Sequence, residues 1–134
     1  MLAGKYNLTI EFLENNYRVR NIVYDPFNRT EEENKNALSI PCDDFETVTC
    51  ANTLNVIKEL SDRQKIYAMA QKYVNAVCLF SVYEGNKSGI GHETKKDCWQ
   101  NNRIYKDYIN EISEYFDHVH TVYGTIVAVG RNRK

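Results

Sequence analysis

Cysteine is the residue type in this sequence whose number and spacing most directly predict chemistry. Its four copies are Cys42, Cys50, Cys78 and Cys98. None of them forms a C-x-x-C pair, which argues against a zinc site and against a thioredoxin-like redox site. An even number of widely spaced cysteines in a chain of 134 residues predicts two structural disulfides. Because such disulfides form in oxidising compartments, the cysteines favour a secreted protein.

Three N-x-S/T sequons agree with secretion. They begin at Asn7, Asn28 and Asn86, and we expect these asparagines to be glycosylation sites on the surface of an extracellular protein. The segment from Met1 to Leu13 lacks the apolar core of a signal peptide. We therefore interpret the sequence as that of a mature secreted chain.

The histidines give little support for catalysis or metal binding. His118 and His120 are two residues apart, and on a helix this spacing separates their side chains by about 200°, so they could not share a metal ion. His92 has no fixed partner, and although Cys98 could act beside it as a thiol nucleophile, the even cysteine count favours a disulfide. The glycines of the same segment do not match a phosphate-binding loop. We therefore predict no enzymatic activity, no catalytic residue, no metal and no cofactor.

Composition and charge narrow the classes of partner. The chain has 17 basic and 18 acidic residues, whereas a nucleic-acid-binding protein normally carries a basic surplus. No uncharged run approaches the roughly 20 apolar residues that a membrane span requires. Hydrophobic residues make up 43% of the chain, which is enough for one core. We therefore expect a single domain over residues 1–134, with no nucleic-acid binding and no membrane insertion.

Apolar residues recur at helical spacing in four stretches, which we predict to be helices. The stretches are residues 6–24, 45–60, 62–83 and 103–123. The third stretch has the cleanest apolar stripe, which includes Ile66, Ala70, Tyr73, Val77 and Phe80. Residues 125–129 could form either a further turn or a short strand.

The lengths of the connections predict how these helices are arranged. Residues 27–44 and 84–102 are long connections, whereas Ser61 and Asp62 make a very short one that forces its two helices to be antiparallel. Long first and third connections are what two crossovers require. The predicted fold class is therefore all-α: a four-helix bundle with up-up-down-down topology, two long crossover loops, and room for short strand segments in the crossovers.

That topology leaves two disulfide pairings open. The start of the second helix and the end of the third lie at the same end of the bundle, which allows Cys50 to reach Cys78. Cys98 can reach Cys42 only if the residues before the last helix run extended along the bundle. We expect Cys50–Cys78 with Cys42–Cys98, and the alternative is Cys42–Cys78 with Cys50–Cys98.

Four segments resemble the short-chain four-helix cytokines of the interleukin-4 and interleukin-13 branch. Residues 50–57 (CANTLNVI) resemble the start of helix B, and residues 70–78 (AQKYVNAVC) resemble the end of helix C. Residues 9–13 (TIEFL) resemble the opening of helix A, and residues 107–112 (DYINEI) resemble helix D. The spacing of Cys42 and Cys50 also resembles the interleukin-2, interleukin-15 and interleukin-21 group, which is the alternative.

The resemblance implies a secreted, monomeric cytokine that joins two different class I cytokine receptor chains and triggers immune-cell signalling. It places one receptor against helices A and C, with contacts from Glu11, Glu14, Arg18, Lys65 and Lys72. It places the second receptor against helix A or D, where we expect contacts from Lys106, Asn110, Ser113 and Asp117. Charged groups on such faces would steer association. Two further hypotheses are a secreted helical carrier of a small apolar ligand, with space beside Ala68, Ala70 and Ala76, and a small enzyme.

Overall fold

The computed structural model describes residues 8–26 and 28–130, and the chain divides into two compact units, Met1–Pro41 and Cys42–Lys134. In the described part, the first unit contains helices α1 (Leu8–Tyr17) and α2 (Glu31–Ser39). The second unit mixes helices and strands, which in chain order are η1 (Cys42–Asp44), β1 (Thr47–Ala51), η2 (Leu54–Val56), α3 (Leu60–Gln71), β2 (Val77–Ser81), β3 (His92–Lys95), β4 (Cys98–Gln100), η3 (Tyr105–Tyr108), α4 (Ile109–Ser113), β5 (His118–Val122) and β6 (Thr125–Val129). The fold is therefore α+β, and the all-α prediction is wrong.

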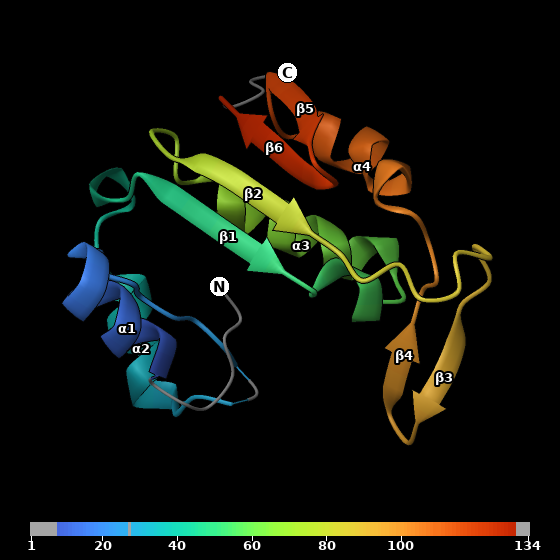
Figure 1. Ribbon diagram of the computed structural model, residues 1–134, viewed down its shortest axis with the longest axis horizontal. Helices are drawn as coiled ribbons and strands as arrows, with labels where there is room; N and C mark the ends of the chain where they lie inside the picture. Colours follow the sequence, from blue (N-terminus) through green and yellow to red (C-terminus); the bar gives the residue numbers. More distant parts are fainter. Residues whose placement is uncertain (1–7, 27, 131–134) are drawn as a thin grey trace. The chain divides into compact units, whose positions relative to one another are not determined.

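The second unit is built on a four-stranded sheet with the strand order β1-β2-β6-β5. β1 and β2 are parallel and are joined through α3, whereas β2 pairs with β6, and β6 with β5, in antiparallel fashion. β3 and β4 form a separate two-stranded sheet that projects away from the larger one (Figure 1). Because β1 and β2 run in the same direction, the chain leaves both strands at the same end of the sheet.

α3 and α4 cover one face of the four-stranded sheet. Alternate residues of the strands turn toward these helices, as the pleat of a sheet requires, and join them in one core. The most deeply buried members are Leu54, Tyr67, Cys78, Phe80, Tyr108, Ile112, Ile126 and Ala128. Tyr67 of α3 meets Phe80 of β2 edge to face, with ring centroids 5.9 Å apart.

The two middle helices of the prediction are each replaced in part by a parallel strand. Residues 45–60 contain β1 and η2, because the run Thr47-Val48-Thr49 is β-branched and such residues fit a strand better than a helix. α3 ends at Gln71, and residues 77–81 form β2. A continuous apolar run such as VCLF is compatible with a buried parallel strand as well as with a helix stripe.

The outer two predicted helices are shorter than expected. α1 ends at Tyr17, since Arg18 adopts the left-handed φ of 55°. The last helical segment ends at Ser113, and residues 118–122 form β5.

The first long connection contains a helix that the sequence analysis did not predict. The N–H of Glu33 donates to the Thr30 hydroxyl at 3.1 Å, and the Glu33 carboxylate accepts from the Thr30 N–H, which completes a capping box at the start of α2. A threonine followed three residues later by a glutamate is a signature of a helix start, so this signal was present in the sequence.

These differences overturn the resemblance to the four-helix cytokines. Of the segments that carried it, residues 50–57 run from the end of β1 into η2, and residues 70–78 run from the end of α3 into β2. The second unit contains a mixed four-stranded sheet, and the described residues do not form a helical bundle. Neither the interleukin-4/13 assignment nor its interleukin-2/15/21 alternative is retained.

The four cysteines are free thiols in the structure, so neither expected disulfide pairing is present. Cys50 and Cys78 lie on neighbouring strands, but the register places Cys50 opposite Phe80 and Cys78 opposite Val48. Both side chains are buried, and burial raises the pKa of the Cys50 thiol and raises the pKa of Cys78 to about 11. Since the thiolate is the reactive form, both residues should be poor nucleophiles at neutral pH.

We therefore expect two classes of thiol when the native protein reacts with an aromatic disulfide reagent at pH 8. Cys42 and Cys98 are partly exposed and should react quickly, whereas Cys50 and Cys78 should react only as fast as the core opens. Absorbance of the released aromatic thiolate measures the fast and the slow reaction rates. In denaturant, all four thiols should react. Fewer than four reactive thiols in denaturant, for protein purified without reductant, would contradict the free-cysteine structure.

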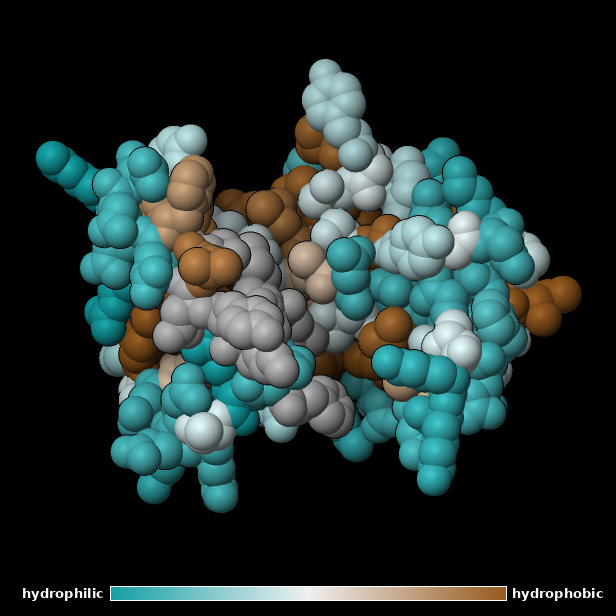
Figure 2. Space-filling model, turned by 60° about the horizontal axis from the view of Figure 1, so that its bottom comes forward, coloured by the Kyte–Doolittle hydropathy of each residue, from teal (hydrophilic) through white to brown (hydrophobic). Residues whose placement is uncertain are grey.

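Some large apolar or aromatic side chains remain on the surface of the described residues; Figure 2 colours the aliphatic ones and phenylalanine brown and the tyrosines pale teal. They include Leu8, Phe12 and Tyr17 in the first unit and Tyr83, Ile90 and Tyr123 in the second. None of the described helices is both long enough and apolar enough to cross a membrane.

Candidate functional site

The carboxyl ends of β1 and β2 lie side by side, and a turn follows each strand there (Figure 1). The Asn52 N–H donates to the Ser81 carbonyl at 2.8 Å, and Asn52 itself takes a left-handed φ of 55°. We call residues 52–55 and 82–85 the carboxyl-end turns. In open α/β sheets, ligands bind outside the carboxyl ends of parallel strands; β1, α3 and β2 form one such parallel unit within this α+β fold, so we take these turns as the candidate site.

Two buried amides hold the second turn through the backbone of Tyr83. The Tyr83 N–H donates to Asn55 Oδ1 at 3.3 Å, and the Tyr83 carbonyl accepts from Gln100 Nε2 at 3.1 Å. Asn55 Nδ2 in turn donates to Gln100 Oε1 at 3.1 Å. Both side chains are almost fully buried, so each of these hydrogen bonds is expensive to lose. The result is a rigid link between both carboxyl-end turns and the end of β4.

Asn101 holds the backbone of the first turn through several hydrogen bonds. Its Nδ2 donates to the carbonyls of Leu54 and Ile57 at 2.9 and 3.0 Å, and its Oδ1 accepts from Trp99 Nε1 at 2.8 Å. The Asn101 N–H also donates to the Asn55 carbonyl at 2.8 Å. Asn101 therefore ties η2 to the segment that follows β4.

Asn102 closes the loop that follows the second turn. Its Nδ2 donates to the Ile90 carbonyl at 3.0 Å and lies 2.8 Å from His92 Nδ1, while its Oδ1 accepts from the Asn86 N–H at 3.3 Å. Gly85 lies against this amide with a φ of 60°, and a Cβ at that position would collide with Asn102 Oδ1. Glycine is needed there both for the left-handed backbone and for the close approach.

This buried scaffold leaves a few groups of the turns facing outward. The Tyr83 side chain is 65% exposed, and Asn52 is also exposed. Glu84 Oε2 accepts from the Tyr105 N–H at 2.9 Å, and the structure gives its other oxygen no hydrogen-bond partner among the described residues. Glu84 is the only charged residue among residues 52–55 and 82–85, and the exposed Lys87 follows it, with its N–H donating to the Glu84 carbonyl at 3.1 Å.

A buried ion-pair network anchors the site to α3 and α4. Arg63 donates to both carboxylate oxygens of Glu111, at 2.8 and 2.9 Å, and its Nη1 donates to the carbonyls of Ile57 and Lys58 just after η2. The Tyr67 hydroxyl donates to Glu111 Oε2 at 2.7 Å. Burial alone would raise the pKa of Glu111, but the hydrogen bonds from Arg63 and Tyr67 outweigh it and hold the pKa below its usual value.

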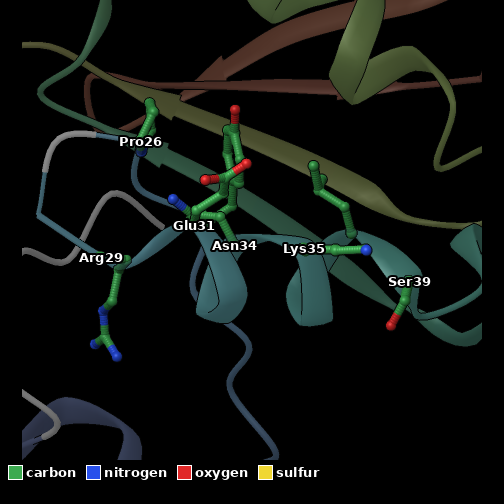
Figure 3. A pocket seen from close by; sticks show the side chains of 8 residues that line it. Pro26, Arg29, Glu31, Asn34, Lys35 and Ser39 are labelled. Atoms are coloured by element: carbon green, nitrogen blue, oxygen red, sulfur yellow. The ribbon is translucent and has the colours of Figure 1, made fainter.

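The first unit has a hollow of about 640 Å³ beside α2, lined by Tyr24, Pro26, Arg29, Glu31, Asn34, Lys35, Leu38 and Ser39. Figure 3 shows Arg29 pointing away from the other labelled side chains. The buried Asn34 is already bonded, because its Oδ1 accepts from the Asp25 N–H and its Nδ2 donates to the Asp25 carbonyl, both at 2.9 Å. Asp25 also accepts two hydrogen bonds from Asn28. These polar groups stabilise the turn before α2, so the hollow is a weaker candidate than the carboxyl-end turns.

The structure distributes the predicted receptor contacts over both units. In the first unit, Glu11 and Glu14 are exposed on α1, and Arg18 lies just beyond its end. In the second unit, Lys65 is exposed on α3, and Lys72 follows the last residue of that helix. The other four residues are also exposed: Lys106 on η3, Asn110 and Ser113 on α4, and Asp117 just before β5. The ion pair that the structure gives Lys65 is with Asp62 at 3.1 Å. No observation tests these residues as receptor contacts, but the bundle faces on which the resemblance placed them do not exist.

The glycosylation and carrier hypotheses also stay predictions. Asn7 lies outside the described residues, and Asn86 is exposed. Asn28 is exposed too, although its Nδ2 donates to Asp25 at 2.9 Å. Ala70 and Ala76, which suggested space for an apolar ligand, are buried in the second unit, whereas the described hollow lies in the first.

Sequence reasoning missed the amides that build the candidate site. Asn52 and Asn55 follow the β-branched run of β1, and Gln100, Asn101 and Asn102 are consecutive. Asparagines directly after a short apolar strand are a recognisable turn signal, so Asn52 could have been found. The pairing of Asn55 with Gln100, 45 residues away, has no such local signal.

Comparison with known proteins found no match among family models, curated proteins or solved structures.

Proposed function

We propose that the second unit binds a small molecule containing a nucleoside, without phosphate groups, at the carboxyl-end turns. The observation that carries the proposal is the exposed Tyr83 ring, whose backbone is clamped by Asn55 and Gln100 at the carboxyl ends of two parallel strands. Ligands of open α/β sheets are characteristically held at this position. Sheet topology indicates only where a ligand would bind, so the class of ligand is inferred from the side chains of the turns.

The outward groups suit a planar, hydrogen-bonding ligand. An exposed tyrosine ring on a rigid backbone offers a stacking surface for a nucleobase. The Asn52 side chain carries both a donor and an acceptor, which is the pattern that an adenine edge requires. The free oxygen of Glu84 can accept a hydrogen bond from a ribose hydroxyl, as acidic residues do in dinucleotide-binding folds.

The charge of the turns argues against a phosphate-rich ligand. Phosphate groups are held by arginine, lysine or the N–H groups of a glycine-rich turn at a helix start. Glu84 is the only charged residue in the carboxyl-end turns, and the nearby Arg103 is bonded to Glu111 at 3.1 Å. A neutral or cationic nucleoside therefore fits better than ATP or NAD⁺. Adenosine, S-adenosylhomocysteine and the cationic S-adenosylmethionine belong to this class.

Isothermal titration calorimetry with these five compounds tests the proposal. We expect at least one of the three phosphate-free nucleosides to bind more tightly than ATP and NAD⁺. Tyr83→Ala should weaken that binding about 10-fold or more, because stacking on one base contributes about 1–3 kcal/mol. Tyr123→Ala is the matched control, since Tyr123 is fully exposed in the turn between β5 and β6. Absent binding, tighter binding of ATP, or equal losses in the two variants would overturn the proposal.

The receptor-bridging function predicted from the sequence is not carried forward. It was implied by a resemblance to helical cytokines that the mixed sheet contradicts.

A further inference from the structure

The structure places His118 and His120 on a strand, where the sequence analysis had placed them on a helix. Both belong to β5, and they pair with Val129 and Val127 of β6. Residues two apart on a strand point to the same face of the sheet, so these two side chains are neighbours and do not diverge. The angular separation of about 200° that a helix would impose on the two side chains is therefore absent.

We propose that His118 and His120 form a two-histidine site for a divalent transition metal, with Cu²⁺ and Ni²⁺ as the favoured ions. Two positions along a strand are about 6.6 Å apart, and each imidazole can lean toward the other to place a nitrogen at the roughly 2 Å that metal bonds require. Both residues are exposed, and the structure gives neither of them a hydrogen bond or an ion pair with the described residues. Their ring nitrogens are therefore available to a ligand.

The choice of metal follows from the donor atoms. Imidazole nitrogen suits Cu²⁺, Ni²⁺ and Zn²⁺, whereas Mg²⁺ and Ca²⁺ require oxygen ligands. Among divalent first-row ions, affinity for such nitrogen donors is highest for Cu²⁺.

The surroundings define the kind of site. Within the described residues, His118 and His120 have no third histidine, cysteine or carboxylate close enough to complete a metal cluster. Two protein ligands leave the remaining coordination positions to water or to another molecule, so the metal would be exchangeable and not structural. Among the described strands β5 pairs only with β6, and the two histidine side chains are exposed to an approaching metal complex.

Ni²⁺–nitrilotriacetate is a suitable probe, because its chelator occupies four positions of an octahedral ion and leaves two neighbouring positions for the two histidines. Surface plasmon resonance of the untagged full chain over immobilised Ni²⁺–nitrilotriacetate measures the affinity. We expect His118→Gln and His120→Gln each to weaken binding about 100-fold, because the second ligand of a pair binds at a high effective concentration. His92→Gln is the control, since His92 is the third histidine of the chain and belongs to β3; its affinity should equal that of the native protein.

A second measurement distinguishes two ligands from one. The electron paramagnetic resonance spectrum of Cu²⁺–nitrilotriacetate bound to the native chain should show coupling to two imidazole nitrogens, and to one in each single variant. His120→Gln combined with Thr121→His keeps two histidines on β5 but puts them on opposite faces, so it should bind as weakly as His120→Gln alone. Equal affinity of native and single-variant proteins, or full binding by the opposite-face variant, would overturn the proposal.

Discussion

Replacing Asn101 by alanine is expected to lower the free energy of unfolding by about 3 kcal/mol or more. The change removes the acceptor for Trp99 Nε1 and the donor to the carbonyl of Leu54, a residue that is fully buried. Each buried polar group left without a partner costs about 1–3 kcal/mol, and the lost side chain also leaves a small cavity. Urea unfolding followed by circular dichroism measures the difference.

Asn110→Ala provides the matched control for that measurement. Asn110 is exposed on α4, so its replacement should change the free energy of unfolding by less than about 0.5 kcal/mol. If Asn101→Ala lay within 1 kcal/mol of the native protein, the amide scaffold beneath the carboxyl-end turns would not have the rigidity that the proposed site requires.

Glu111→Ala is expected to destabilise the protein by about 3–5 kcal/mol, because it leaves the Arg63 guanidinium charged and without its carboxylate in the interior. The Arg63 side chain is 6% exposed, and it donates to both oxygens of Glu111. Asp62→Ala breaks the exposed pair with Lys65 and should cost no more than about 1 kcal/mol. Thermal and urea unfolding of the two variants would show this contrast, and equal effects would contradict the buried network.

The same network predicts an acid dependence of stability. The folded state holds the pKa of Glu111 below its usual value near 4.5, so the ionised carboxylate stabilises the fold above that value. This contribution should be lost as the pH falls through the lower folded-state pKa. In Glu111→Gln the free energy of unfolding should therefore fall less steeply below about pH 4.5 than in the native protein. Parallel pH profiles for the two proteins would contradict this assignment.

The candidate site could be predicted from the sequence only in its local parts. The asparagine after β1 and the glycine at position 85 are turn residues that a sequence displays. The clamp on Tyr83 requires Asn55 and Gln100 to meet across 45 positions, and that meeting depends on the docking of β4 against η2. The two histidines of β5 are a second example, because they share a face of the sheet only if residues 118–122 form a strand.

The sequence by itself determined which side chains are apolar enough to enter the core. Ala70 and Phe80 belong to the apolar stripe predicted over residues 62–83 and are buried, whereas Val77 of the same stripe is 38% exposed. It did not determine whether those residues lie on helices or strands, because a run of four consecutive apolar residues such as VCLF at 77–80 is compatible with both periods. Val77–Ser81 and His118–Val122 became strands because β1 and β6 supply hydrogen-bond partners for their backbones. The pairing of β2 with β1 and β6 joins residues that are 30 or more positions apart, so only the tertiary structure could decide it, whereas β5 and β6 pair across the two-residue turn of Tyr123 and Gly124.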